Sequence, residues 1–424
     1  MSHWKRNLIV LASTQMLTLI GFSSYLSFIP YYIQEMGVTD QAEVLNWVAA
    51  FSSASAVSMM IAAPIWGGLS DRYGRKVMLV RATLAGLVLA YLMGLARTPM
   101  QLLIIRVLQG AMGGTIGAAI TLVATETPED NMGTALGMMQ TVQFLGQAVG
   151  PVLGGILADA LGFRAVFPIA SALMAVSLIG TVALVRERTS ARSSRSAKAK
   201  GGKTALRTVL TRTTVILLVC IGVIRFGTLV QNPVIPLYIQ NLTTDQSRLA
   251  TLAGTVTSIT ALTSAVAALV VGKIGDRFGQ KLVLIVSSAL IAVFFIPQAF
   301  VSTVGQLMLL RGVQGIFLGG TMPTTSALLA KSSDPTRRGV VFGLSSSMQA
   351  GGRALGPLVG AAVAQVWGMP QSFLFTAGVF GLIAVMVAVL VPARGAASLA
   401  EPALATNEGA LSPAASPQET TPAS

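Results

Sequence analysis

The chain has 424 residues, of which 53% are hydrophobic and 10% charged, and its formal net charge is +14. Soluble domains carry about 25% charged residues, so this composition excludes an ordinary soluble globular protein. The single cysteine, Cys220, excludes an intramolecular disulfide, and the single histidine, His3, leaves little scope for metal or nucleophile chemistry.

Apolar runs recur along the chain, and each is long enough to cross the ~30 Å hydrocarbon core of a membrane as a helix. The first run follows Trp4-Lys5-Arg6. It is longer than the core of a typical signal peptide and no small-residue cleavage site follows it, so we expect a retained helix. Twelve spans are predicted, at residues 7–29, 47–69, 77–96, 100–123, 134–158, 165–185, 214–239, 249–271, 282–300, 304–329, 339–366 and 371–392.

Basic residues indicate the orientation of these spans. Three Lys or Arg residues lie on predicted outer loops (Arg97, Arg164 and Arg248), four lie deep within spans, and the others lie on the opposite side or at the helix ends next to it. This bias follows the positive-inside rule, so both chain ends are predicted to be cytoplasmic. The distribution also argues against a nucleic-acid partner and favours contact with membrane lipids.

Two segments lie outside the predicted spans. Residues 186–213 are basic and rich in Ser and Ala, and residues 393–424 are rich in Ala, Pro, Ser and Thr. Such compositions favour a surface-lying linker and a disordered tail, both cytoplasmic. The predicted plan is therefore a first half at 1–185, a linker at 186–213, a second half at 214–392 and a tail at 393–424.

The chain repeats itself at an offset of 205 or 206 residues. The charged stretch Gly67–Lys76 returns as Gly272–Lys281, and Arg106 returns as Arg311. An apolar chain duplicated in this way predicts an all-α integral membrane protein, with twelve transmembrane helices in two pseudo-symmetric halves of six.

Three motifs carry a resemblance to a known family. They are Gly67-x-Leu69-x-Asp71-Arg72-x-Gly74-Arg75-Lys76, Arg106-x-x-Gln109-Gly110, and Gly137-x8-Gly146-x3-Gly150-Pro151-x2-Gly154-Gly155. With these motifs, over about residues 1–392, the chain resembles the major facilitator superfamily and in particular its twelve-span drug:proton antiporters. The third motif is the one associated with antiporters.

The resemblance implies a secondary transporter in the bacterial inner membrane, with both termini cytoplasmic. Its partners would be small-molecule substrates, protons and lipids, its energy source the proton gradient, and it would act as a monomer without a cofactor, metal site or catalytic residue. A metabolite, sugar or siderophore exporter or importer of the same fold is the alternative. The sequence has no phosphate-binding loop for an ATPase and no charged ring for a channel.

Motif residues are predicted to act in conformational change. Asp71 is expected to cap the helix of the third span, and Gly74 to permit the turn before it. The resemblance implies that this predicted loop is a cytoplasmic latch between the halves, while a topological anchor is the alternative. The smooth glycine faces are predicted to let neighbouring helices slide during alternating access, with static small-residue packing as the alternative. The predicted gating residues are Gly67, Asp71, Arg72, Gly74, Arg75, Asp276, Arg277, Gly146, Gly150, Pro151, Gly154, Gly155, Gly356 and Pro357.

Four arginines fall deep within spans, away from their ends, whereas no carboxylate does. An arginine at mid-bilayer costs about 2.5–3.5 kcal/mol on insertion scales, so each should face the protein interior or a water-filled cavity. Arg106 and Arg311 are duplicated and, with Gln109, are predicted to be structural or to relay protons. Arg225 and Arg353 have no basic counterpart in the other half, so they are predicted to bind substrate, with snorkelling or carbonyl contacts as the alternative.

The lack of a membrane carboxylate favours neutral, anionic or zwitterionic amphiphiles over lipophilic cations. Aromatic side chains on the first, fifth and seventh spans are predicted to complete the substrate wall, because such surfaces accommodate varied ligands. Contact with another helix or with lipid is the alternative for each of them. They are Tyr25, Phe28, Tyr32, Phe144 and Phe226.

Overall fold

The computed structural model describes residues 3–128, 131–185, 187, 211–333 and 338–391. Most of the predicted linker and the predicted tail lie outside these residues. The first half consists of α1 (His3–Ser24), α2 (Ile29–Glu35), α3 (Gln41–Tyr73), α4 (Arg75–Leu95), α5 (Pro99–Ala111), α6 (Thr115–Glu126), α7 (Met132–Leu161) and α8 (Phe163–Leu184). The second consists of α10 (Arg212–Val230), α11 (Val234–Leu242), η3 (Gln246–Arg248), α12 (Leu249–Phe278), α13 (Gln280–Gln298), α14 (Val304–Lys331), α15 (Arg338–Trp367) and α16 (Met369–Leu390).

Ten stretches of the described residues are long and apolar enough to cross a membrane. The remaining two predicted spans correspond to α14 and α15, which are 28 and 30 residues long but are richer in polar residues and glycine. Three spans are each built from two helices in line, namely α1–α2, α5–α6 and α10–α11. The predicted all-helical membrane fold is therefore confirmed, with six spans in each half.

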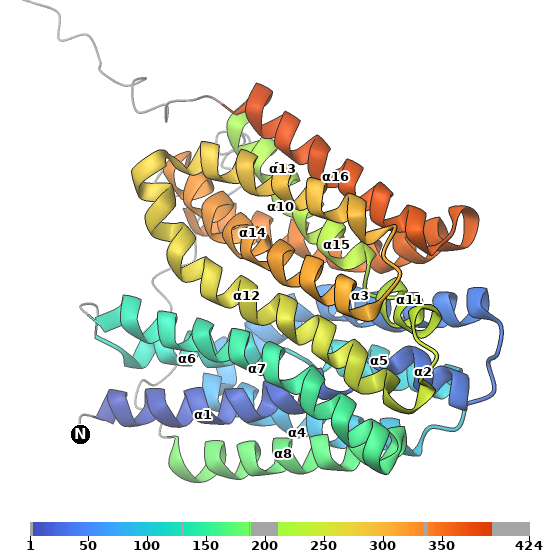
Figure 1. The fold of residues 1–424 in the computed structure, drawn as a ribbon. Helices are drawn as coiled ribbons and strands as arrows, with labels where there is room; N and C mark the ends of the chain where they lie inside the picture. Colours follow the sequence, from blue (N-terminus) through green and yellow to red (C-terminus); the bar gives the residue numbers. More distant parts are fainter. Residues whose placement is uncertain (1–2, 129–130, 186, 188–210, 334–337, 392–424) are drawn as a thin grey trace, which may run out of the picture.

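The halves form two groups of helices, with α1 to α8 in one and α10 to α16 in the other (Figure 1). Across the boundary between them, α7 packs on α12 and α3 packs on α15. Within each half the first span packs on the fifth, as α1 on α7 and α10 on α15. The same pairs therefore recur in both halves, as a duplicated bundle requires.

Side-chain packing preserves the duplication. The Tyr32 hydroxyl donates to the carbonyl oxygen of Met93 over 3.1 Å, and the Tyr238 hydroxyl donates to that of Gln298, the equivalent residue of the second half, over 3.2 Å. The rings of these two tyrosines lie 5.1 Å and 5.0 Å from those of Phe167 and Phe373, measured between centroids. In each half, a tyrosine thus joins the first span to the third and sixth.

The motif that was expected to form a loop is almost entirely helical. Only Gly74, with φ of 93°, separates α3 from α4, and Gly279, with φ of 94°, separates α12 from α13. Glycine adopts a positive φ without a Cβ clash, so one residue suffices for the turn. Asp71 consequently lies in the last turn of α3, and the prediction that it stands at the start of the following helix is wrong.

The two ends of the bundle differ. We call the end with Gly74 and Gly279 the motif end, and the end with the α2–α3 and α11–α12 connections the closed end. In Figure 1 the N-terminus of α1 lies at the motif end on the left, and α2 and α11 lie at the closed end on the right.

Candidate functional site

Hydrogen bonds join the two halves at the closed end. The Tyr31 hydroxyl donates to the carbonyl oxygen of Pro236 over 2.6 Å. The side-chain amides of Gln34 and Gln240 donate to each other, with N···O distances of 3.1 and 3.2 Å. The Asp159 carboxylate, on α7, accepts from backbone N–H groups of α12. This end is therefore held shut in the conformation described.

Glycines along α7 are crowded near the closed end and open near the motif end. A Cβ placed on Gly154 would meet the backbone of Ser24 on α1, and one placed on Gly155 would meet the backbone of Ala250 on α12. A Cβ placed on Gly137 would have no described atom within 4 Å. The helices around α7 thus separate toward the motif end, so the bundle is open there.

The predicted glycine faces lie largely inside the halves. A Cβ on Gly146 would press on Leu19, one on Gly150 on Ser23, and one on Gly356 on the backbone of Phe226. Pro151 contacts the other half, because a Cβ on Gly254 of α12 would meet its carbonyl oxygen. Pro357 lies inside α15. Their role in conformational change stays a prediction.

Arg225 and Arg353 lie close together near the middle of the second half. They project from α10 and α15, which touch where a Cβ on Gly352 would lie 2.9 Å from the Cβ of Arg225. Arg225 is half-buried, and its Nε atom is covered without a hydrogen-bond partner among the described residues. The sequences of α10 and α15 contain no Asp or Glu that could neutralise the two guanidinium groups.

Arg353 lies on a polar stripe of α15. Ser346 and Arg353 are exposed and Gln349 is half-buried, and their spacing of three and four residues places them on one helical face. A separate stripe, with Leu355 and Leu358 exposed, is apolar and suited to lipid. The exposure of Arg353 on the polar stripe therefore indicates an aqueous space rather than hydrocarbon.

Arg106 is enclosed within the first half. Its Nη1 atom donates to the side-chain oxygen of Gln109 over 2.6 Å, and Gln109 is also hydrogen-bonded to the Tyr25 hydroxyl. The rings of Phe22 and Phe51 lie 5.1 and 4.6 Å from its guanidinium carbon. Only 5% of Arg106 is exposed, so the arrangement fits the predicted structural role without excluding a relay.

Arg311 is enclosed in the second half but has fewer partners. Its guanidinium carbon lies 5.8 Å from the Phe295 ring, and its Nε and Nη2 atoms have no hydrogen-bond partner among the described residues. Gln314 is the counterpart of Gln109 in the second half. Its side-chain oxygen accepts a hydrogen bond from the side-chain amide of Gln298 over 3.0 Å. The duplicated arginines therefore share burial against aromatic rings but not a hydrogen-bond pattern.

Three predicted wall residues are buried inside the first half. Tyr25, Phe28 and Tyr32 have no exposed surface and pack against Phe167, with Phe28 also stacked on Phe163 at 5.4 Å. In this conformation they lie behind the surface that a ligand could reach, so their contact with substrate stays a prediction. The sequence left both uses open, because helical spacing cannot distinguish a cavity-facing ring from a core ring.

The other two predicted wall residues are accessible. Phe144 on α7 and Phe226 on α10 are half-buried, and Phe226 is next to Arg225 in the chain. Its ring lies edge-on to Phe375 at 6.5 Å between centroids. Phe226 therefore places an apolar surface beside a guanidinium group, an arrangement suited to an amphiphile.

At the motif end, a carboxylate that was not predicted fixes the start of α4. Both oxygens of Glu187 accept hydrogen bonds, from the backbone N–H groups of Arg75 and Lys76, each over 3.1 Å. The Lys76 ammonium in turn donates to the carbonyl oxygen of Val185 over 2.6 Å. Glu187 thus supplies negative charge at the N-terminus of α4.

The remaining motif residues have local neighbours. Arg72 and Arg277 lie 5.4 and 5.5 Å from the rings of Tyr73 and Phe278. A Cβ on Gly67 would have no described atom within 4 Å. The side chains of Asp71 and Asp276 lie outside the described residues, so the latch between halves stays a prediction.

Replacing Glu187 by alanine should lower the stability of the first half by about 0.5–2 kcal/mol, because two N–H groups at the start of α4 lose their acceptor. The midpoint of thermal unfolding in detergent would measure this. Glu35→Ala is the control, since the exposed Glu35–Arg164 pair at 3.8 Å should contribute no more than about 1 kcal/mol. A larger loss in the control would contradict the assignment.

A second unpredicted feature interrupts the fourth span of the first half. Gly114, with φ of 111°, ends the break between α5 and α6. Trp66 donates to the freed carbonyl oxygen of Ala111 over 2.6 Å, and Arg81 donates to that of Gly113 over 2.9 Å. The Arg81 guanidinium carbon also lies 3.4 Å from the Trp66 ring centroid. The Gly-Gly pair inside an apolar run was the available signal.

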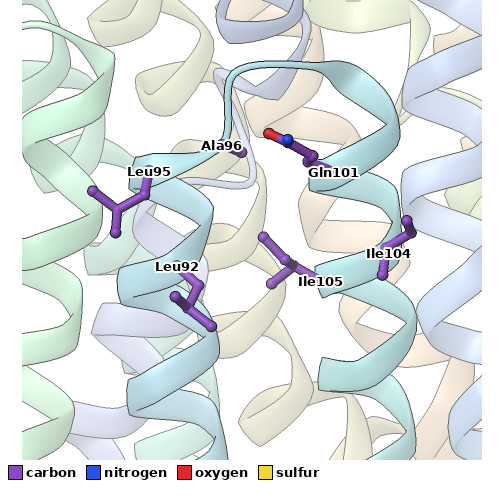
Figure 2. Close-up of a pocket in the computed structure, with 6 residues that line it drawn as sticks. All are labelled: Leu92, Leu95, Ala96, Gln101, Ile104 and Ile105. Carbon is purple, nitrogen blue, oxygen red and sulfur yellow. The ribbon is translucent and has the colours of Figure 1, made fainter.

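A small hollow of about 230 Å³ lies between α4 and α5. Figure 2 shows its lining, which is aliphatic except for one amide: Leu92, Leu95, Ala96, Gln101, Ile104 and Ile105. The Gln101 oxygen already accepts from the backbone N–H of Arg97 over 2.9 Å. The hollow contains none of the predicted substrate residues. In the residues that the structure describes, no three His, Cys, Asp or Glu side chains are grouped to hold a metal ion.

Comparison with known proteins fits this geometry. The profile of the Major Facilitator Superfamily matches residues 11–245 and 217–416. The chain belongs to the major facilitator superfamily. Within the superfamily, it is 35% identical over 385 residues to the multidrug resistance protein MdtG of Salmonella typhimurium (strain LT2), covering 89% of this chain and 93% of that protein. MdtG of Salmonella arizonae is 34% identical over the same shares.

Solved structures of other transporters share the fold. The human organic anion transporter MFSD10 matches with a TM-score of 0.67 at 17% identity, over 91% of this chain and all (100%) of that one. The D-xylose-proton symporter matches with a TM-score of 0.72 at 15% identity, over 92% and 98%. These identities support the fold alone. Membership makes the chain a multi-pass membrane transporter of small molecules rather than an enzyme.

Proposed function

We propose that this transporter exports amphiphilic small molecules by alternating access, and that the proton gradient drives export. Neutral, anionic or zwitterionic compounds are its preferred substrates. The observation that carries this preference is the neighbouring pair Arg225 and Arg353, on helices whose sequences contain no carboxylate. Similarity to MdtG over both halves supports export of toxic compounds.

The substrate would bind between the halves, on the side that is open toward the motif end. Arg225 and Arg353 would donate to its polar group, while Phe226 and Phe144 contact its apolar part. Behind the binding surface, the buried rings of Tyr25, Phe28 and Tyr32 would support it from the first half. They could contact substrate only if the first half rearranged. Arg106, Gln109 and Arg311 would hold the spans in register or relay protons.

The motif end would face the cytoplasm of a bacterial cell, with the protein in the inner membrane. The basic segment 186–213 and the basic residues near Gly74 and Gly279 support this orientation. Both termini would then be cytoplasmic, and the conformation described would be open to the inside. One chain contains both halves, which supports action as a monomer.

Cells that overproduce the protein should accumulate less of an amphiphilic dye than cells with an empty vector, and an uncoupler should abolish the difference. Accumulation is measured by fluorescence, with a transport-deficient variant produced at the same level as the control. Export that continues after the proton gradient has collapsed would refute proton coupling. A metabolite, sugar or siderophore transporter of the same fold would instead leave every dye unaffected.

A further inference from the structure

The closed end contains two equivalent contacts of different chemistry. Asp159 lies in the last turn of α7 in the first half, and Gln365 stands at the repeated position near the end of α15 in the second. Asp159 accepts from the backbone N–H groups of Ala250 and Thr251 over 3.1 and 2.8 Å. Each side chain thus reaches from one half to the start of a helix in the other.

Gln365 makes the neutral version of this contact. Its amide nitrogen donates to the carbonyl oxygen of Ala42 over 3.2 Å and to the side-chain oxygen of Asn46 over 2.7 Å, at the start of α3. Because the glutamine amide carries no charge, these two contacts are hydrogen bonds between neutral groups. Asp159 is a carboxylate at the positive end of α12, where its charge is favoured by the helix dipole as well as by two hydrogen bonds.

The backbones of α7 and α12 are in close contact near Asp159. A Cβ on Gly155, one turn before it, would meet the backbone of Ala250, and one on Gly254 would meet the backbone of Pro151. Because glycines let α7 and α12 approach this closely, the carboxylate is held against the N–H groups by main chain rather than by mobile side chains. Separation of the two helices breaks both hydrogen bonds at once.

We propose that Asp159 is the principal latch of the closed end, and that Gln365 is a weaker counterpart on the other side of the pseudo-twofold axis. Opening this end exposes the Asp159 carboxylate and costs two charge-assisted bonds, whereas release of Gln365 costs neutral ones. Asp159 is therefore a positioning residue that sets the balance between the two access states. The latch rests on the alternating access proposed above, but not on the identity of the substrates.

Spin labels on the two halves provide the test. Labels are attached at Thr39→Cys and Thr244→Cys, on exposed residues of the closed end, after the buried native cysteine is removed by Cys220→Ser. The ratio of long to short distances, measured by pulsed electron resonance in lipid nanodiscs, reports opening. Asp159→Asn should raise this ratio roughly tenfold or more, whereas Gln365→Ala should raise it less, by about twofold to tenfold.

Asp159→Glu distinguishes the latch from general disruption, because it keeps the charge and should keep the ratio within about threefold of the parent protein. All variants must elute as a single species of the parent's size. An unchanged ratio in Asp159→Asn would overturn the proposal. So would a larger effect of Gln365→Ala than of Asp159→Asn, or equal opening in Asp159→Glu and Asp159→Asn.

Discussion

Replacing Gly154 by alanine should destabilise the protein by about 3 kcal/mol or more, at the upper end of the cost of overpacking. The added Cβ would overlap the backbone of Ser24, including its carbonyl oxygen, and a backbone cannot rotate away as a side chain can. We therefore expect a lower unfolding midpoint in detergent and less protein in the membrane. The measurement is thermal unfolding of purified protein.

Gly137 on the same helix offers the matched control. A Cβ there has no described atom within 4 Å, and Gly137 lies inside α7. Gly137→Ala should thus be neutral, or stabilising by up to about 1 kcal/mol because alanine favours a helix. If both substitutions lowered the unfolding midpoint alike, the distinction between a crowded and an open part of α7 would be wrong.

Removing either central arginine should change which substrates are exported. Arg225→Gln or Arg353→Gln should raise the KM for an anionic amphiphile by roughly tenfold to a hundredfold, which corresponds to loss of a charged hydrogen bond of about 1.5–3 kcal/mol. The KM for a neutral analogue of the same shape should change by less than about threefold. Initial rates of transport into inverted vesicles would give both values.

Gln147 is the control for this experiment, because it occupies the position in the first half that repeats Arg353. Gln147→Ala should alter transport of the two analogues equally, since its amide already donates to the backbone of Gln143 over 3.2 Å. Arg353→Lys should keep part of the preference because the charge remains. Equal losses for the anionic and the neutral analogue in Arg353→Gln would show that the arginines act on structure and not on recognition.

Much of the fold was predictable because membrane helices leave two independent signals. The length of the apolar runs located most of the spans. The more polar α14 and α15 were also expected because the repeat requires a counterpart for each span of the first half. The offset of about 205 residues then matched Tyr32 with Tyr238, and their hydrogen bonds to the equivalent residues Met93 and Gln298 confirm the match. The charged residues of Gly67–Lys76 suggested a loop. In the structure α3 extends through most of this stretch, and Gly74 alone forms the turn to α4.

The candidate site was harder to predict because it depends on the directions of side chains between distant helices. The arginines could be selected by the cost of burying charge, which is visible in a sequence. Tyr25, Phe28 and Tyr32 could not be distinguished from core residues, because both uses have the same helical spacing. The partners of Asp159 and Glu187 are backbone N–H groups, and no residue type signals such a partner.

The paired amides of Gln34 and Gln240 have a consequence for how this sequence can vary. Each amide gives the other one donor and accepts one in return, so the pair is complementary to itself. Two identical subunits related by a twofold axis form such a contact on the axis, where a residue meets its own copy. Replacing one amide by an apolar side chain would leave the other without its partner, so we expect the two positions to vary together among related sequences.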